Sequence, residues 1–186
     1  MKDNFQQTTT GRQPMVTSSF KDRDSAERAF SDLQARGYTD KEIHVLMSDD
    51  TRKRLFTKDE VKDSKMVEVE HGHKTLAGAG VGGAVGGAVG ATILAIMAAG
   101  AGLTIPGLGL VIVGPLAGAL AGGATGAAAG GLVGTLVGAG IPDDHAKVYE
   151  NDIKGGLIVL GVNPRSEDDA RFFENQWRTS GTNVYR

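Results

Sequence analysis

Hydrophobic and polar positions divide the chain into two charged flanks and a long middle stretch without charge. No residue from Thr75 to Pro142 is charged, so all 42 charged residues lie in residues 1–74 and 143–186. In the flanks, apolar residues recur at helix and strand spacings between charges of both signs. The pattern predicts a globular fold built from the flanks and a different kind of packing for the middle.

The first flank predicts a β-α-β unit. Met15–Phe20 has strand character, and Ile43–Met47 reads as a buried strand. The helix between them has an apolar face formed by Ala26, Ala29, Phe30 and Leu33. Asp24 and Glu27 have the spacing of a capping box, and Gly37 suits the end of the helix. Beyond this unit, residues 49–65 are weakly helical and residues 66–70 alternate like a short strand.

The second flank predicts two helices and two strands. Pro142 and the acids after it suit the first turn of a helix that ends at Gly155-Gly156. Leu157–Val162 is predicted to be a buried strand. Ser166 and Asp169 have the spacing of an N-cap for the next helix, and a last strand is predicted after Gly181. The two apolar helix faces consist of Ala146, Tyr149 and Ile153, and of Ala170, Phe173 and Trp177.

The two flanks resemble each other. The first flank's Ala26, Ala29, Leu33 and Gly37 align without gaps on Ala170, Phe173, Trp177 and Gly181. Two β-α-β units predict an α+β fold, a ferredoxin-like split sandwich interrupted by the uncharged stretch. We expect residues 1–14 to be a disordered tail, 15–74 and 143–186 to be the two halves, and 75–142 to be an insertion. The expected core is Phe30, Leu33, Leu46, Ile158, Leu160, Phe173 and Trp177.

Glycine recurs every fourth residue in the insertion, which contains 21 of the 28 glycines. On a helix this spacing places the glycines on nearly one face, where another backbone can approach closely. We therefore expect a glycine-zipper hairpin of helices over about 75–102 and 114–140, joined by a turn at Leu103–Val113. The expected helix-packing residues are Gly78, Gly82, Gly86, Gly90, Gly114, Gly118, Gly122, Gly126, Gly130, Gly134 and Gly138.

The composition of this hairpin favours a membrane. Each glycine inside a helix costs about 1 kcal/mol relative to alanine in water, whereas helices are the open-chain solution to backbone hydrogen bonding in lipid. The leading hypothesis is two antiparallel transmembrane spans in the cytoplasmic membrane. Both termini are then cytoplasmic, and the hairpins associate into homo-oligomers.

Two other arrangements of the hairpin stay open. One is a hairpin that turns within the membrane, because the strongest apolar run, Thr92–Val113, lies at its tip. The other is a cytoplasmic, soluble oligomer, or a ligand- or partner-binding module, whose hairpins are buried against each other. A flexible linker is disfavoured, because aliphatic residues separate the regularly spaced glycines.

Candidate chemistry is sparse, and we expect no enzyme, no cofactor and no small-molecule substrate. His71 and His73, beside two glutamates, are weak candidates for a metal site; a polar hinge is the simpler interpretation. His145 near a helix start is expected at the surface. A Gly-x-Gly-x-x-Gly match at Gly78 lacks the acid that dinucleotide binding requires. The net charge of −2 gives no argument for nucleic acid, and the absence of cysteine excludes disulfides.

Three pieces of the chain together resemble the bacterial general stress, or heat-induced stress (YflT-like), domain proteins. They are Met15–Leu33, the stretch GIPDDHAKVYENDIKGG at residues 140–156, and the glycine zipper between them. The resemblance implies a stress-associated, non-enzymatic protein, and the family offers no catalytic residues to carry over. The long insertion exceeds the compact domain of that family.

Overall fold

The computed structural model describes residues 14–56, 93, 96–97, 102–105, 107–122, 125–138 and 141–186. Its strands are β1 (Val16–Phe20), β2 (Ile43–Ser48), β3 (Leu103–Ile105), β4 (Leu110–Val113), β5 (Ile158–Val162) and β6 (Thr182–Tyr185). Its helices are α1 (Arg23–Ala35), α2 (Asp49–Leu55), α5 (Pro115–Gly122), α6 (Thr125–Gly138), α7 (Asp143–Lys154) and α8 (Glu167–Ser180). This content confirms the α+β class predicted from the sequence.

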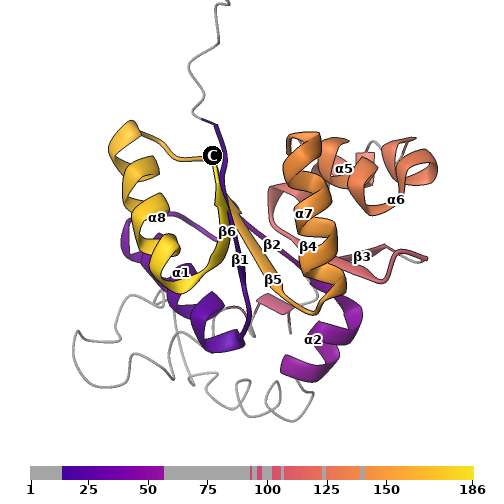
Figure 1. Ribbon diagram of the computed structural model, residues 1–186, viewed down its shortest axis with the longest axis horizontal. Coiled ribbons are helices and arrows are strands. Elements are labelled where there is room, and N and C mark those ends of the chain that lie inside the picture. The colour runs from indigo at the N-terminus through magenta and orange to yellow at the C-terminus, as the bar shows by residue number, and fades with distance from the viewer. Residues whose placement is uncertain are drawn as a thin grey trace, which may run out of the picture.

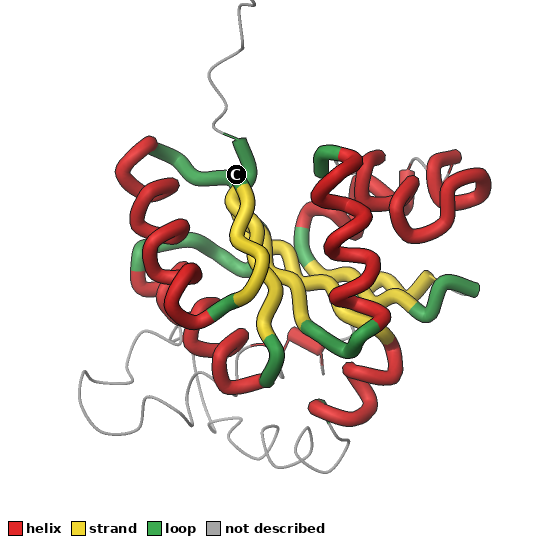
Figure 2. The backbone as a smooth tube through the Cα atoms, viewed as in Figure 1, coloured by secondary structure: helices red, strands yellow, loops and turns green. Residues whose placement is uncertain are grey.

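All six strands form one antiparallel sheet in the order β3-β4-β2-β5-β1-β6. Helices cover both faces of this sheet, with α1 and α8 on one side and α5, α6 and α7 on the other (Figure 1, Figure 2). The two flanks interleave, because β5 from the second flank pairs with both β1 and β2 of the first. Val162, for example, faces Val16 on one side and Ile43 on the other.

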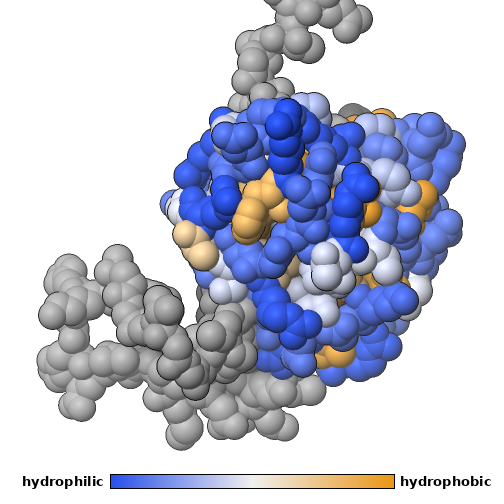
Figure 3. Space-filling model, turned by 60° about the vertical axis from the view of Figure 1, so that its left-hand side comes forward, coloured by the Kyte–Doolittle hydropathy of each residue, from blue (hydrophilic) through white to orange (hydrophobic). Residues whose placement is uncertain are grey.

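The face under α1 and α8 holds the aromatic core. Phe20 meets Trp177 edge-on with ring centroids 6.0 Å apart, and Tyr38 meets Phe173 at 5.4 Å. The seven expected core residues Phe30, Leu33, Leu46, Ile158, Leu160, Phe173 and Trp177 are all at most 1% exposed, as predicted. The outer surface on this side consists mainly of hydrophilic residues (Figure 3). Helix faces read from the 3.6-residue period therefore pack as expected.

The helix ends agree with the sequence except at the start of α1. There Asp22, not Asp24, is the N-cap, and its carboxylate accepts a hydrogen bond from the Ser25 N–H at 2.8 Å. Glu27 pairs instead with Arg23, at 2.5 Å, so the predicted capping box is wrong. The predicted cap of α8 is confirmed, because Ser166 accepts from the backbone of the third residue after it.

The opposite face of the sheet has an aliphatic core. Leu116 of α5 and Leu132 and Leu136 of α6 pack there with α7 and with side chains of β2, β4 and β5. This core comprises Leu46, Leu110, Ile112, Leu116, Leu132, Leu136, Ile141, Ala146, Tyr149, Ile153 and Val159. The predicted apolar face of the helix that follows Pro142 is therefore confirmed.

The centre of the uncharged stretch differs from its prediction. Leu103–Val113 was expected as a turn between two helices, but it forms the hairpin β3–β4. β4 is fully buried and extends the sheet at β2, with Val113 facing Val45. Gly107 and Gly109 take positive φ angles of 86° and 59° in the hairpin turn. The apolar, β-branched run Leu-Val-Ile-Val satisfies its backbone groups by pairing with a strand, so it does not continue a helix.

The second predicted zipper helix is also changed, whereas the first is described only at residues 93 and 96–97. The second, expected to be continuous over 114–140, is divided into α5 and α6, and α6 is interrupted at Gly131 (φ 59°, ψ −146°). Of the first, Ile93 is 1% exposed and belongs to the core under α1 and α8, where Ile96 and Met97 also pack. The expected disordered tail, the strand at residues 66–70 and the rest of the first helix lie outside the described residues.

Candidate functional site

Gly114 is required by a close backbone approach, not by a helix groove as predicted. It lies in the turn from β4 to α5 with φ 91°, and a Cβ there would sit 2.0 Å from the carbonyl oxygen of Ile43. Any side chain would collide with the backbone of β2. This glycine therefore fixes the start of α5 against the sheet.

Other glycines of the same series face open space. A Cβ added to Gly118 or Gly138 would meet no atom within 4 Å, and the neighbouring Val137 is 41% exposed. Together with the exposed Pro115, these residues form what we call the α5–α6 surface. None of these four residues is charged, and Val137 is the large apolar side chain among them.

The remaining predicted site residues are only partly covered by the structure. Gly122, Gly126, Gly130 and Gly134 lie within α5 and α6, whereas Gly78, Gly82, Gly86, Gly90, His71 and His73 lie outside the described residues. The packing role of the glycines thus stays a prediction. Among the helices that the structure describes, none has the length and apolarity needed to cross a bilayer. Nor do the described residues bring together three side chains able to hold a metal ion.

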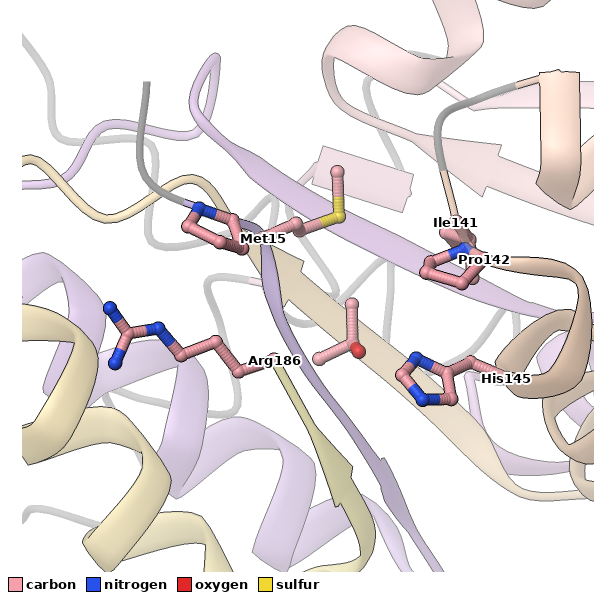
Figure 4. A pocket seen from close by; sticks show the side chains of 7 residues that line it. Met15, Ile141, Pro142, His145 and Arg186 are labelled. Carbon is pink, nitrogen blue, oxygen red and sulfur yellow. The ribbon is translucent and has the colours of Figure 1, made fainter. Parts of the chain in front are cut away.

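A pocket of about 160 Å³ opens where the start of β1 meets the start of α7 (Figure 4). It is lined by Pro14, Met15, Thr17, Ile141, Pro142, His145 and Arg186. His145, expected at the surface, is half-buried in its wall and stacks on Tyr185 with ring centroids 4.0 Å apart. The pocket therefore joins residues from both ends of the chain and from the end of the insertion.

Buried hydrogen bonds hold α7 beside this pocket. The Tyr149 hydroxyl contacts the Thr17 hydroxyl at 2.6 Å and the carbonyl oxygen of Asn183 at 3.2 Å. One turn further, Asp152 accepts hydrogen bonds from Ser19 and from the Asn183 side chain. Burial raises the pKa of Tyr149, so its hydroxyl stays protonated and acts as a structural donor. These groups position α7 across β1 and β6.

His44 is a buried histidine of β2 that the sequence analysis did not single out. Its Nδ1 accepts a hydrogen bond from the Leu116 N–H at 3.3 Å, in the first turn of α5, and its Nε2 lies 3.4 Å from the amide nitrogen of Asn163. The side chain is 1% exposed, and burial lowers its pKa to about 4. A neutral ring is thus required for the contact with α5.

A charged network closes the opposite side of the molecule. Arg165 binds both carboxylate oxygens of Glu42 at 2.7 and 2.8 Å, and Asp169 accepts from the Tyr38 hydroxyl at 2.8 Å. The hydrogen bond from Arg165 is the main cause that lowers the pKa of Glu42 to about 2. This network connects the end of α1 to the start of α8.

The pocket and His44 escaped the sequence analysis because their parts are far apart in the chain. The one local signal was a histidine inside the apolar strand Ile-His-Val-Leu-Met, which indicates a buried ring with hydrogen-bond partners. Comparisons with protein-family models, curated proteins and solved structures found no match. The resemblance to general stress domain proteins therefore stays a prediction, and the functional argument rests on this chain alone.

Proposed function

We propose that this chain is a non-enzymatic assembly protein, in which a ferredoxin-like α+β domain associates with further copies through the α5–α6 surface. The ferredoxin-like assignment is supported by the order β2-β5-β1-β6, in which each β-α-β unit encloses a strand of the other. The hairpin β3–β4 then extends this four-stranded arrangement at β2.

The proposal rests on where the described residues of the strongest apolar run, Thr92–Val113, lie in the structure. Ile93 is buried in the core under α1 and α8, and all four residues of β4 are buried within the sheet. The described residues Ile93 and Leu110–Val113 of this run are therefore buried inside the chain's own domain. Among the described residues of α5 and α6, Val137 and Gly138 are exposed, with no charge to solvate the α5–α6 surface.

Self-association suits this surface because two uncharged surfaces meet without like-charge repulsion or ion desolvation between them. The open space at Gly118 and Gly138 would let a second helix approach closely. Catalysis has less support, because the polar groups of α7 are engaged in holding the helix to β1 and β6. A stress-associated role rests on the resemblance of the sequence alone.

Anchoring to a bilayer is the second candidate, and the charge-free composition of residues 75–142 favours it. The position of β3 and β4 weakens the version with two simple spans, because the predicted connector belongs to the same sheet as the flanks. A lipid-bound form would have to hold the remaining helices at the membrane while this sheet stays intact.

The test is the mass of the full chain in detergent-free buffer, measured by light scattering after size exclusion. We expect particles larger than the 19.3 kDa monomer for the wild type and a shift toward monomer for Val137→Lys. Asn175→Lys adds the same charge at an exposed site of α8 and should leave the assembly intact. A monomeric wild type would overturn the proposal. A native protein that stays with alkaline-washed membranes would replace assembly with anchoring.

A further inference from the structure

We infer that the pocket between β1 and α7 binds a neutral, single-ring aromatic molecule that carries one hydroxyl or N–H group. This inference does not depend on the proposed assembly, because it rests on other residues than those of the α5–α6 surface. It follows from the size of the pocket, its walls, its one available polar group and the charges around it.

The size of the pocket limits the ligand to about one ring. Its volume is about 160 Å³, and an apolar cavity of about 150 Å³ accommodates one benzene molecule in a protein interior. A nucleotide or a two-ring cofactor would not fit without movement of β1 or α7. A single water would leave most of the apolar wall uncovered.

The walls suit a flat apolar ring. Pro14, Pro142 and Ile141 present rigid or well-anchored aliphatic surfaces, and Ile141 is 3% exposed. Met15 supplies a thioether, and sulfur makes favourable contacts with aromatic ring edges. Gly161 helps to place it, because a Cβ there would lie 3.2 Å from the Met15 sulfur. The glycine thus leaves room for the thioether at the mouth of the pocket.

His145 is the polar group available to a ligand. Its ring is fixed by stacking on Tyr185, and no hydrogen bond to its ring nitrogens is found among the residues that the structure describes. The other hydroxyl in the wall is already engaged, since Thr17 contacts Tyr149 and donates to the Tyr185 carbonyl oxygen at 3.4 Å. A neutral imidazole can accept from a ligand O–H or donate to its oxygen.

The charges near the pocket favour a neutral ligand over an anion. Arg186 lines the pocket, but its guanidinium pairs with Glu167 at 2.8 Å and reaches Glu174 at 3.7 Å. Figure 4 draws the end of this side chain pointing away from His145. On the other side, Asp143 and Asp144 occupy the first turn of α7, and Asp143 pairs with Lys147. Among the described residues near the pocket, Arg186 and Lys147 are thus both engaged by carboxylates, and Asp144 adds a negative charge that disfavours a carboxylate ligand.

The experiment titrates phenol into the full-length protein and follows the amide and imidazole NMR signals of the pocket residues. We expect saturable shifts at His145 and Thr17 with a dissociation constant on the order of 1 mM, as the few atoms of phenol allow. Benzoate tests the charge and cyclohexanol tests the flat ring, and both should bind at least about fivefold more weakly. Equal binding of cyclohexanol, or no shift at about 20 mM phenol, would refute the inference.

Two variants separate the ring contacts from the hydrogen bond. His145→Phe keeps a ring beside Tyr185 but removes the nitrogens, so phenol should weaken about fivefold while toluene binding is retained. Met15→Trp should fill the pocket and abolish the binding of both probes, with the circular dichroism spectrum reporting whether the fold survives. Lys147→Ala, on the same helix outside the pocket, is the control. Phenol binding that is unchanged in His145→Phe would contradict the assigned role of the imidazole.

Discussion

The two faces of the sheet differ in their covering helices, because α5 and α6 carry no charge whereas α1, α8 and α7 do. Under α1 and α8 the chain packs Phe20, Phe173 and Trp177, and ion pairs such as Arg165–Glu42 close the surface above them. Under α5 and α6 the core is aliphatic, the helices carry no charge, and apolar atoms remain outside. The difference teaches that ion pairs stabilise the surface over the first face, whereas α5 and α6 rely on apolar packing and backbone fit.

The strongest test of this contrast is a pair of glycine substitutions in the uncharged region. Gly114→Ala should cost about 3–5 kcal/mol of unfolding free energy, because a Cβ at φ 91° would collide with the Ile43 carbonyl. Gly118→Ala should be neutral or stabilising by up to about 1 kcal/mol, because its Cβ meets open space in a helix. Urea unfolding measures both, and similar losses would show that the two glycines do not differ as described.

Low pH should destabilise the packing of α5 on β2, because it favours protonation of His44. Its pKa is lowered from 6.5 to about 4 in the folded chain, so the unfolded chain binds the extra proton between these values. Stability is then complete above pH 6.5, falls as the pH drops, and has lost about 3 kcal/mol by pH 4. His44→Gln should remove this part of the pH dependence. An unchanged slope of unfolding free energy between pH 6.5 and 4 in the variant would exclude His44 as its source.

A tyrosine on each face allows a matched comparison of buried hydroxyls. Tyr149→Phe should cost about 1.5 kcal/mol, because it removes the buried donor to the Thr17 hydroxyl and the Asn183 carbonyl oxygen. Tyr38→Phe removes the hydroxyl that donates to Asp169 and accepts from the Arg165 N–H. It should cost about 1 kcal/mol, because Asp169 keeps Arg36 as a partner, at 2.6 Å. Thermal unfolding of the two variants measures which loses more stability. A larger loss for Tyr38→Phe would mean that the hydroxyl in the charged network contributes more to stability than the one beneath α7.

The smallest expected effect belongs to the charged face at low pH. The pKa of Glu42 is lowered to about 2 chiefly by Arg165, so this pair stabilises the fold above pH 4.5 and is lost as the pH falls through 2. Because the pair is exposed, the loss should be minor. Glu42→Gln should flatten the acid limb of the stability curve below pH 4.5 without altering the limb assigned to His44. If Glu42→Gln also changed the pH dependence of stability assigned to His44, the two faces of the sheet would be energetically coupled.

The sequence was most informative where side-chain period and size act together. The faces of α1, α7 and α8 follow from apolar residues at helical spacing, and Trp177 and Phe173 are buried as predicted. The cap at Asp22 was missed because Asp22 and Asp24 are two residues apart and both precede the same apolar face. Only the contact of Asp22 with the Ser25 N–H distinguishes them.

The uncharged stretch was harder to interpret because glycine spacing suggested a helix face and concealed a strand signal. Leu110–Val113 is an apolar run rich in β-branched residues after two turn glycines, which is also the pattern of a hairpin. Spacing alone cannot reveal a backbone collision such as that at Gly114, nor the break at Gly131. The pocket was beyond reach for another reason, since Met15 and His145 meet only through the topology of the sheet.

The strand order has a consequence for synthesis on the ribosome. Among the described strands, β1 pairs only with β5 and β6, so its partners emerge about 140 residues after it. At about 5–20 residues per second, the first strand waits on the order of ten seconds with its backbone unpaired. During that interval the nascent chain exposes an unpaired strand edge together with a long glycine-rich stretch. Correct folding therefore requires that translation be completed before this edge pairs with another nascent chain on the same polysome.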